Sequence, residues 1–175
     1  MNKNTIIINL FAGPGAGKST GAAYIFSQLK MAGVDAEYVS EFAKDKVWEG
    51  NSEVFKCQFY VTGKQAFKIS RCFGKVDVIV TDSPIALGAI YADTDGLKKA
   101  CVDEFNKYDT NMNVFIKRVK KYNPNGRHQT EAEAREIDET LHKDLDELAI
   151  SYIEVEGNKE GYDLIVQKIL DKLEK

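Results

Sequence analysis

The amino-acid sequence predicts a three-layer α/β domain, in which helices cover both faces of a five-stranded, mainly parallel sheet. Apolar β-branched runs alternate with helix-like segments, which is the pattern of strands joined by right-handed helical crossovers. The first run, residues 5–11, is apolar almost throughout and stops at a glycine cluster, as a buried parallel strand does. A length of 175 residues, 43% of them hydrophobic, suits one core rather than two. We therefore expect a single domain spanning residues 1–175.

The predicted elements follow one another in a regular order. After the strand at 5–11, a helix is expected over residues 18–31, ended by Gly33, and a short strand over 35–40. Thr130 opens a later helix with a capping box to Glu133. The remaining predicted elements are helices over 51–73, 84–107 and 162–173 and strands over 76–81, 113–119 and 151–155. Parallel sheets bind ligands at the carboxyl ends of their strands, so the residues that follow each strand are the candidates for function.

Composition narrows the class of protein. A net charge of -3 argues against a dedicated nucleic-acid coat, although it leaves room for a local basic patch. The three cysteines have neither C-x-x-C spacing nor a histidine cluster nearby, so we expect reduced thiols and a cytoplasmic location. The apolar run at 5–11 is too short to span a membrane and lacks a basic leader. The chain is expected to begin at Met1 and to have no membrane partner.

A phosphate-binding loop is the strongest motif. Between the first strand and the first helix stands the segment Ala12-Gly13-Pro14-Gly15-Ala16-Gly17-Lys18-Ser19-Thr20. Glycines let successive N–H groups point at phosphate oxygens, and the helix N-terminus adds partial positive charge. Lys18 is expected to reach the β- and γ-phosphates of ATP, and Ser19 to ligate Mg²⁺. Ala12 replaces the first glycine of the strict pattern, a small change that leaves the prediction of ATP binding intact.

Two carboxylates are predicted to face this loop from neighbouring strands. Asp82 ends the third strand, where it can hold Mg²⁺ through water, polarise an attacking hydroxyl or cap the following helix. Glu41 ends the second strand on the acceptor side, where it can accept a proton from a hydroxyl as a general base or complement a helix N-terminus. Phe42 can stack on the ring of an acceptor or belong to the core.

The helix expected over 51–73 carries two sets of polar side chains. Gln58, Thr62 and Gln65 share one face at i, i+4, i+7 spacing, and their amides can read the edge of a base or stay at the surface. The opposite face carries a second set, which is either a solvated basic surface or a contact for phosphate or nucleic acid: Lys56, Tyr60, Lys64, Lys68 and Arg71.

Three arginines surround an Asn-Pro-Asn-Gly turn and suggest a lid. Arg118, Arg127 and Arg135 lie in or beside a segment of about residues 118–138, which can close over the nucleotide or be an ordinary surface loop. A guanidinium brought over the transferring phosphoryl group neutralises charge that develops in the transition state. Arg127 is the preferred candidate because it stands at the turn itself.

The order of these motifs resembles that of a known family. FAGPGAGKST, VSEFAKD, VIVTDSP and YNPNGRHQTEAEAREID, with a closing YIEVEGN, resemble the nicotinamide-riboside-kinase-like P-loop family and its phage-encoded members, over nearly the whole chain. The resemblance implies a kinase with Glu41 and Gln65 on the acceptor, Asp82 at the metal or the acceptor hydroxyl, and Arg127 in the lid. Deoxyribonucleoside kinases look similar too, but Asp82-Ser83-Pro84 lacks the arginine that those enzymes place there.

The sequence leaves the acceptor open. The leading hypothesis is an ATP- and Mg²⁺-dependent kinase for a small nucleoside, nucleotide or nucleoside-like acceptor. A kinase for hydroxymethylated bases in DNA is an alternative that would use the basic face of the long helix. A P-loop ATPase switch without a small-molecule acceptor is a second alternative. Neither the preference for ATP over GTP nor the oligomeric state follows from the sequence.

Overall fold

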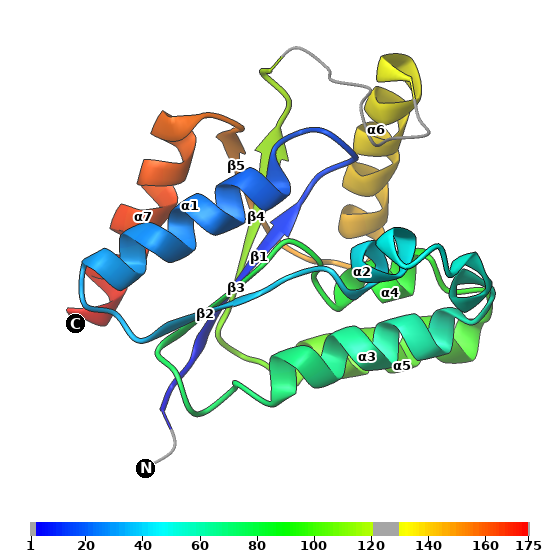
Figure 1. Ribbon diagram of the computed structural model, residues 1–175, viewed down its shortest axis with the longest axis horizontal. Coiled ribbons are helices and arrows are strands. Elements are labelled where there is room, and N and C mark those ends of the chain that lie inside the picture. The colour runs from blue at the N-terminus through cyan, green and yellow to red at the C-terminus, as the bar shows by residue number, and fades with distance from the viewer. Residues whose placement is uncertain (1–2, 121–129, 175) are drawn as a thin grey trace.

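The computed structural model describes residues 3–120 and 130–174, which form a five-stranded sheet covered by helices (Figure 1). The strands are β1 (Ile6–Phe11), β2 (Ala36–Val39), β3 (Val78–Thr81), β4 (Asn111–Lys117) and β5 (Ile153–Glu156). Their order across the sheet is β2-β3-β1-β4-β5, and all four pairings are parallel. The predicted sheet is confirmed, and it is entirely rather than mainly parallel.

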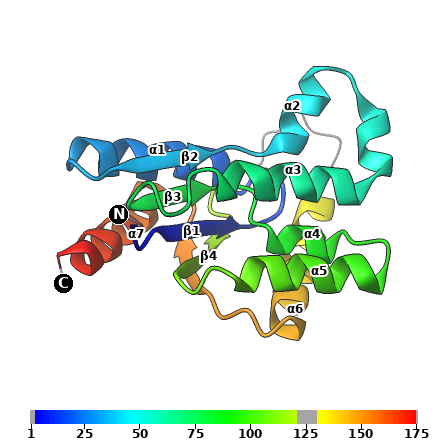
Figure 2. The ribbon, with the colours of Figure 1, turned by 90° about the horizontal axis from the view of Figure 1, so that it is seen from below.

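Helices cover both faces of the sheet. The helical elements are α1 (Lys18–Met31), α2 (Phe42–Trp48), the short 3₁₀ helix η1 (Ser52–Lys56), α3 (Gln58–Ser70), α4 (Ala86–Ile90), α5 (Asp95–Asn106), α6 (Glu131–Glu147) and α7 (Lys159–Leu173). Figure 1 shows α1 and α7 together on one side of the sheet and α3 to α6 on the other. Viewed from below, α3, α4 and α5 pack side by side (Figure 2).

The alternation of side chains along β1 builds two cores. Ile8 and Leu10 pack with α1 and α7, whereas Ile7 and Phe11 pack with α3, α4, α5 and α6. Every residue of β1 is buried, which explains why the run at 5–11 is apolar rather than alternating. Asn9 is the exception in chemistry: its amide donates to Asn111 and Asn113 on β4, so the buried polar group is satisfied.

Several expected boundaries were wrong. The single helix predicted over 51–73 is η1 followed by α3, because Cys57 between them has non-helical dihedral angles. The helix predicted over 84–107 is α4 followed by α5, because Thr94 is extended and its hydroxyl caps α5 at the Leu97 amide. α2 was not predicted as an element, because none of its seven residues is buried and its sequence carries no amphipathic signal.

The predicted capping box is present at the start of α6. The Thr130 hydroxyl accepts a hydrogen bond from the Glu133 amide, and the Glu133 carboxylate accepts one from the Thr130 amide. None of the described helices is long and apolar enough to cross a membrane. The carboxyl ends of all five parallel strands lie at one edge of the sheet, and the segments that follow β1, β2, β3 and β4 meet there.

Candidate active site

The phosphate loop lies between β1 and α1, at the centre of that edge. Gly15 and Gly17 have positive φ angles of 81° and 117°, which L side chains adopt only with strain. Gly17 is the N-cap of α1, and within the described residues no side chain caps the first turn and no acidic residue stands in it. The first N–H groups of α1 and its positive dipole end are therefore available to an anion.

Tyr162 of α7 supports the loop from the α1 side of the sheet. Its hydroxyl donates to the Gly17 carbonyl oxygen at 3.1 Å. A Cβ atom on Gly17 would lie 2.5 Å from that hydroxyl, and one on Gly21 would lie 2.6 Å from the tyrosine ring. Packing therefore favours glycine at both positions, and the positive φ angle favours it at Gly17 as well. Sequence reasoning did not predict this contact.

Lys18 is the first residue of α1 and follows the glycines of the loop. Its ammonium donates to the carbonyl oxygens of Ala12 and Gly13. Burial lowers the pKa of Lys18, and the carboxylates of Glu41, Asp82 and Asp138 act in the opposite direction. Lys18 is half-buried beside these carboxylates, in a place where an anionic ligand would be attracted to its ammonium.

Asp82 directly follows β3 and is 2% exposed. One of its oxygens accepts a hydrogen bond from the Tyr38 hydroxyl at 2.9 Å, and the other accepts one from the Glu41 amide at 3.1 Å. Burial together with the Asp82 charge raises the pKa of Tyr38. Tyr38, which sequence reasoning missed, thus orients Asp82, one of the two predicted metal ligands.

The donor set fits Mg²⁺. A serine hydroxyl and a carboxylate supply the oxygen ligands that this ion prefers, and the ion commonly takes its other ligands from water and phosphate. In the described part of the chain, no group of three or more His, Cys, Asp or Glu side chains is arranged around a single metal position. Ser19 and Asp82 therefore suit an ion that is delivered with a nucleotide rather than one held by the protein alone.

Glu41 lies between β2 and α2 and lines a pocket next to the phosphate loop. Burial raises its pKa, Lys18 opposes this effect, and Asp82 adds to it. A carboxylate whose pKa is raised toward neutral pH is better matched to general-base work than one fully exposed to water. Its role on the acceptor side, expected from the sequence, stays a prediction.

The pocket beside Glu41 has a volume of about 270 Å³ and is formed by α2, η1, α3 and α4. Its lining includes most of the residues predicted to touch an acceptor, which are Glu41, Phe42, Gln58 and Gln65. It also includes two aromatic rings that were not predicted, Phe55 and Tyr91. The Phe42 ring packs edge-on against Tyr60 at 5.7 Å between centroids. Phe42 is therefore a wall of the pocket and no part of the main core.

The two glutamines of α3 are used differently. Gln65 is 4% exposed, and its amide already accepts from the Phe42 amide and donates to the Thr81 hydroxyl. Gln58 donates to Thr62 at 3.2 Å, and its carbonyl oxygen accepts no hydrogen bond from any residue that the structure describes. Gln65 thus sets the shape of the pocket, whereas Gln58 has an acceptor atom available to a ligand.

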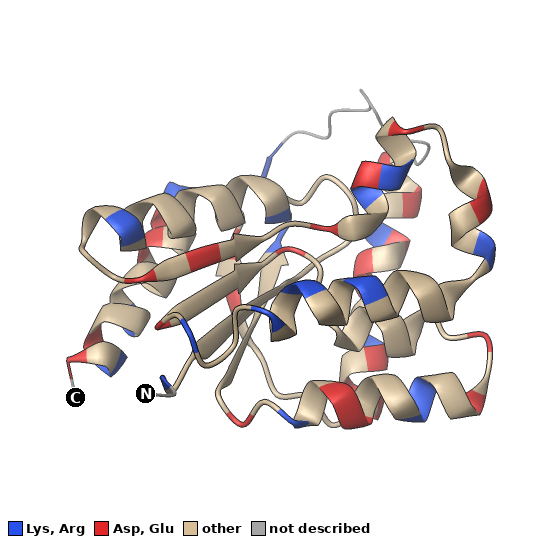
Figure 3. Cartoon of the chain, turned by 60° about the horizontal axis from the view of Figure 1, so that its bottom comes forward, with Lys and Arg blue, Asp and Glu red and all other residues tan. Residues whose placement is uncertain are grey.

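The basic face of α3 lies apart from the pocket. Figure 3 marks the basic positions along α3 in blue. Lys56 of η1 pairs with Glu53, and Lys68 of α3 donates to the Ser40 carbonyl oxygen. Arg71 is exposed beyond the last turn of α3 and does not line the pocket. Six residues of helix separate it from Gln65 by about 9 Å, so its contact with an acceptor stays a prediction.

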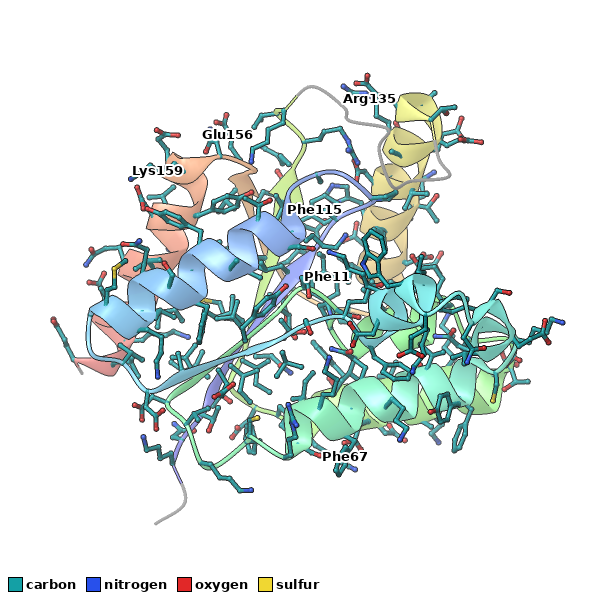
Figure 4. All side chains as sticks on the ribbon, in the orientation of Figure 1. Phe11, Phe67, Phe115, Arg135, Glu156 and Lys159 are labelled. Carbon is teal, nitrogen blue, oxygen red and sulfur yellow. The ribbon has the colours of Figure 1, made fainter. Side chains whose placement is uncertain are left out.

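The three predicted lid arginines are not equivalent. Arg118 is not on the surface: its side chain is 3% exposed and pairs with Asp138 of α6 at 2.9 Å. Arg135 is exposed near the upper end of α6 and pairs with Glu131 one turn earlier (Figure 4). Arg127 lies outside the described residues. The prediction that Arg118 moves with a lid therefore conflicts with its buried ion pair, and Asp138 is a functional candidate that sequence reasoning missed.

Comparisons with known proteins agree with this geometry. A family model described as an AAA domain, AAA_28, matches residues 7–161. The crystal structure of a NadR protein in complex with NR superposes with a TM-score of 0.68 at 16% identity, over 95% of this chain and 51% of that one. A shikimate kinase from Bacteroides thetaiotaomicron superposes with a TM-score of 0.55 at 14% identity, over 97% and 99% of the two chains. This chain therefore spans about half the length of the NadR protein. No curated protein sequence matches it.

Proposed function

The chain belongs to the AAA_28 family of P-loop domains, and from this premise we propose that it is an ATP- and Mg²⁺-dependent phosphotransferase for an unphosphorylated, nucleoside-like acceptor. The observation that carries the proposal is the position of Glu41. This residue lines the acceptor pocket, and its backbone amide donates to Asp82, which follows β3 beside the phosphate loop. Glu41 thus stands between the two halves of the proposed transfer site, where the phosphoryl donor and the acceptor hydroxyl have to meet.

Each residue of the site has a separate task in the proposed reaction. The phosphate loop and Lys18 hold the triphosphate, and Ser19 and Asp82 supply oxygen ligands to Mg²⁺. The metal ion, when bound with the nucleotide, neutralises charge on the phosphate oxygens. Glu41 takes the proton from the acceptor hydroxyl as its oxygen attacks phosphorus. Arg127, predicted from the sequence, adds a positive charge over the phosphoryl group in the transition state.

The charge of the pocket supports an unphosphorylated acceptor. Within the described residues, Glu41 is the one charged side chain in the lining, which contains neither lysine nor arginine. A nucleoside monophosphate or another anionic acceptor would place negative charge beside this carboxylate without a counterion, which is costly in a partly desolvated site. Phe42, Phe55 and Tyr91 offer aromatic surface to a flat ring, and Gln58 offers a hydrogen-bond acceptor.

The structure gives less support to the two alternatives. A kinase for hydroxymethylated DNA would need a basic track beside the pocket, yet none of the described residues of the basic face lines the pocket, and Lys56 of η1 and Lys68 of α3 already bind acceptors within the protein. A P-loop switch without an acceptor would leave Glu41 and the pocket unused. Both alternatives are separated from the leading proposal by one experiment.

Label transfer from ATP is the direct test. The protein and a Lys18→Ala variant are incubated with γ-labelled ATP, Mg²⁺ and a panel of nucleosides, nucleoside monophosphates and hydroxymethylated DNA. We expect label on at least one nucleoside with the wild-type protein only. Transfer to a monophosphate alone would refute the argument from pocket charge, transfer to DNA would favour the first alternative, and ATP hydrolysis without any transfer would favour the second.

A further inference from the structure

The start of the phosphate loop is in direct contact with α6. The Gly13 amide donates to Asp138 Oδ1 at 2.6 Å. A Cβ atom on Gly13 would lie 2.7 Å from that oxygen and 2.9 Å from the Ala134 carbonyl oxygen, so the helix backbone itself abuts the loop. Only glycine allows this approach, because one neighbour is a backbone carbonyl oxygen of α6 and the other is a carboxylate oxygen whose side chain is held by Arg118. The loop and the helix are therefore fitted to each other at this point.

The second oxygen of Asp138 is held by a buried arginine. Asp138 Oδ2 accepts from Arg118 Nε at 3.1 Å and from Nη2 at 2.9 Å. The same Nη2 donates to the Ala134 carbonyl oxygen at 3.4 Å. Because Arg118 directly follows β4, the strand next to β1, and its side chain is 3% exposed, the carboxylate has a fixed orientation toward Gly13.

The Ala12–Gly13 peptide group is hydrogen-bonded at both its N–H and its C=O. The amide N–H of Gly13 and the carbonyl of Ala12 belong to the same planar peptide group, in which they point in opposite directions. Asp138 accepts from the N–H, and the Lys18 ammonium donates to the C=O. The plane of this peptide is thus set between a carboxylate and an ammonium. If the carboxylate contact is lost, the peptide can rotate and Lys18 loses a fixed anchor.

We propose that Asp138 is a positioning residue for nucleotide binding, which orients the Ala12–Gly13 peptide and through it the Lys18 ammonium. The inference rests on the proposed function, because it concerns the use of the phosphate loop for ATP. Asp138 does not touch the acceptor pocket, so its effect is confined to the nucleotide half of the site. Its charge is also among those that oppose the burial-driven lowering of the Lys18 pKa.

Asp138→Asn tests this role, with Glu139→Gln as the matched control. Asn keeps the size of Asp138 but removes the charge and presents a donor to Arg118. Glu139 is the next residue of α6, is exposed, and loses the same charge in the control. We expect the Kd for the magnesium complex of the non-hydrolysable analogue AMPPNP to rise about 10- to 100-fold in Asp138→Asn, as for loss of a charged hydrogen bond, and to stay unchanged in the control. The Gly13 amide proton resonance should move in the variant without nucleotide.

Three results would overturn the proposal or its premise. Wild-type affinity in folded Asp138→Asn refutes the positioning role, whatever the Gly13 resonance does. If Asp138→Asn does not fold, Gly13→Ala displaces the loop while keeping Asp138 and Arg118, and we expect the same rise in Kd; a folded Gly13→Ala protein with wild-type affinity also refutes the role. Failure of the wild-type protein itself to bind the magnesium complex of AMPPNP refutes the proposed function, and the inference with it.

Discussion

Replacing Glu41 by Gln separates the two halves of the proposed site. The change keeps the size of the side chain that lines the pocket but removes the proton acceptor. Loss of a general base lowers rates by about 10²- to 10⁴-fold, which corresponds to about 2.7 to 5.4 kcal/mol of barrier. We expect single-turnover phosphoryl transfer to a nucleoside to fall within this range.

ATP binding is expected to respond in the opposite direction. The charge of Glu41 is among those that oppose the lowering of the Lys18 pKa, so it also acts on a triphosphate held by that lysine. Removing it takes a negative charge away from the phosphate site. The Kd for Mg·ATP, measured by calorimetry, should therefore be equal to or lower than that of the wild-type protein.

The pH dependence of transfer and stability follows from the raised pKa of Glu41. The base is available only once the pH rises above this raised pKa, so wild-type transfer should increase with pH on the acid side, whereas the slow Gln variant should not. Because the pKa of Glu41 is raised in the folded state, the protonated carboxyl stabilises the protein when the pH is below its ordinary pKa of 4.5. This stabilisation is lost as the pH rises through the pKa of Glu41 in the folded protein. Glu41→Gln should thus unfold at a higher temperature than wild type at pH 7, and the difference should narrow in acid.

Glu37→Gln is the control for this variant, and one result would refute the assignment of Glu41 as the general base. Glu37→Gln removes the same charge from an exposed position on β2 and should leave transfer and binding unchanged. If Glu41→Gln transfers at the wild-type rate but binds Mg·ATP more weakly, Glu41 acts on the nucleotide and the assignment of a general base is wrong.

Three further substitutions test the rest of the site. Lys18→Ala should abolish transfer in the label assay. It should not lower the unfolding temperature measured by calorimetry, because burial already disfavours the ammonium in the folded protein. Transfer at the wild-type rate would contradict the assignment of Lys18. Tyr38→Phe removes a hydrogen bond worth about 1.5 to 3 kcal/mol to the charged Asp82, so half-saturation by Mg²⁺ at fixed ATP should shift upward by about tenfold or more, and an unchanged titration would exclude the link. Arg127→Ala should slow single-turnover transfer strongly with little change in the Kd for ATP, as for a charge used mainly in the transition state; wild-type transfer would leave the segment without a catalytic role.

The fold could be predicted from the sequence because its signals are local. The strand at β1 is buried on both faces, so its apolar run stands out, and the capping box of α6 involves residues three positions apart. The elements that were missed or merged lack such signals. α2 buries none of its residues, and the break between α4 and α5 depends on a single capping hydroxyl at Thr94.

The candidate site could be predicted only where it is contiguous in the chain. The phosphate loop occupies one segment, whereas Asp138 and Tyr162 reach it from 125 and 145 residues away. The spacing of residues along the sequence does not indicate contacts between segments so far apart. Arg118 shows the reverse error, since an arginine beside a turn resembles a mobile lid residue in the sequence but is buried in an ion pair in the structure.

The phosphate loop takes its shape from both helical layers. Tyr162 of α7 holds the Gly17 carbonyl from one face of the sheet, and Asp138 of α6 holds the Gly13 amide from the other. The sheet places β1 between these layers, so the loop that follows it is within reach of both. Glycine is required at both ends for the same reason, because a Cβ atom there would meet Tyr162 or Asp138 within 3 Å. The glycine pattern that identifies the loop therefore reflects two demands at once, backbone N–H groups turned toward phosphate and close packing of helices from opposite faces.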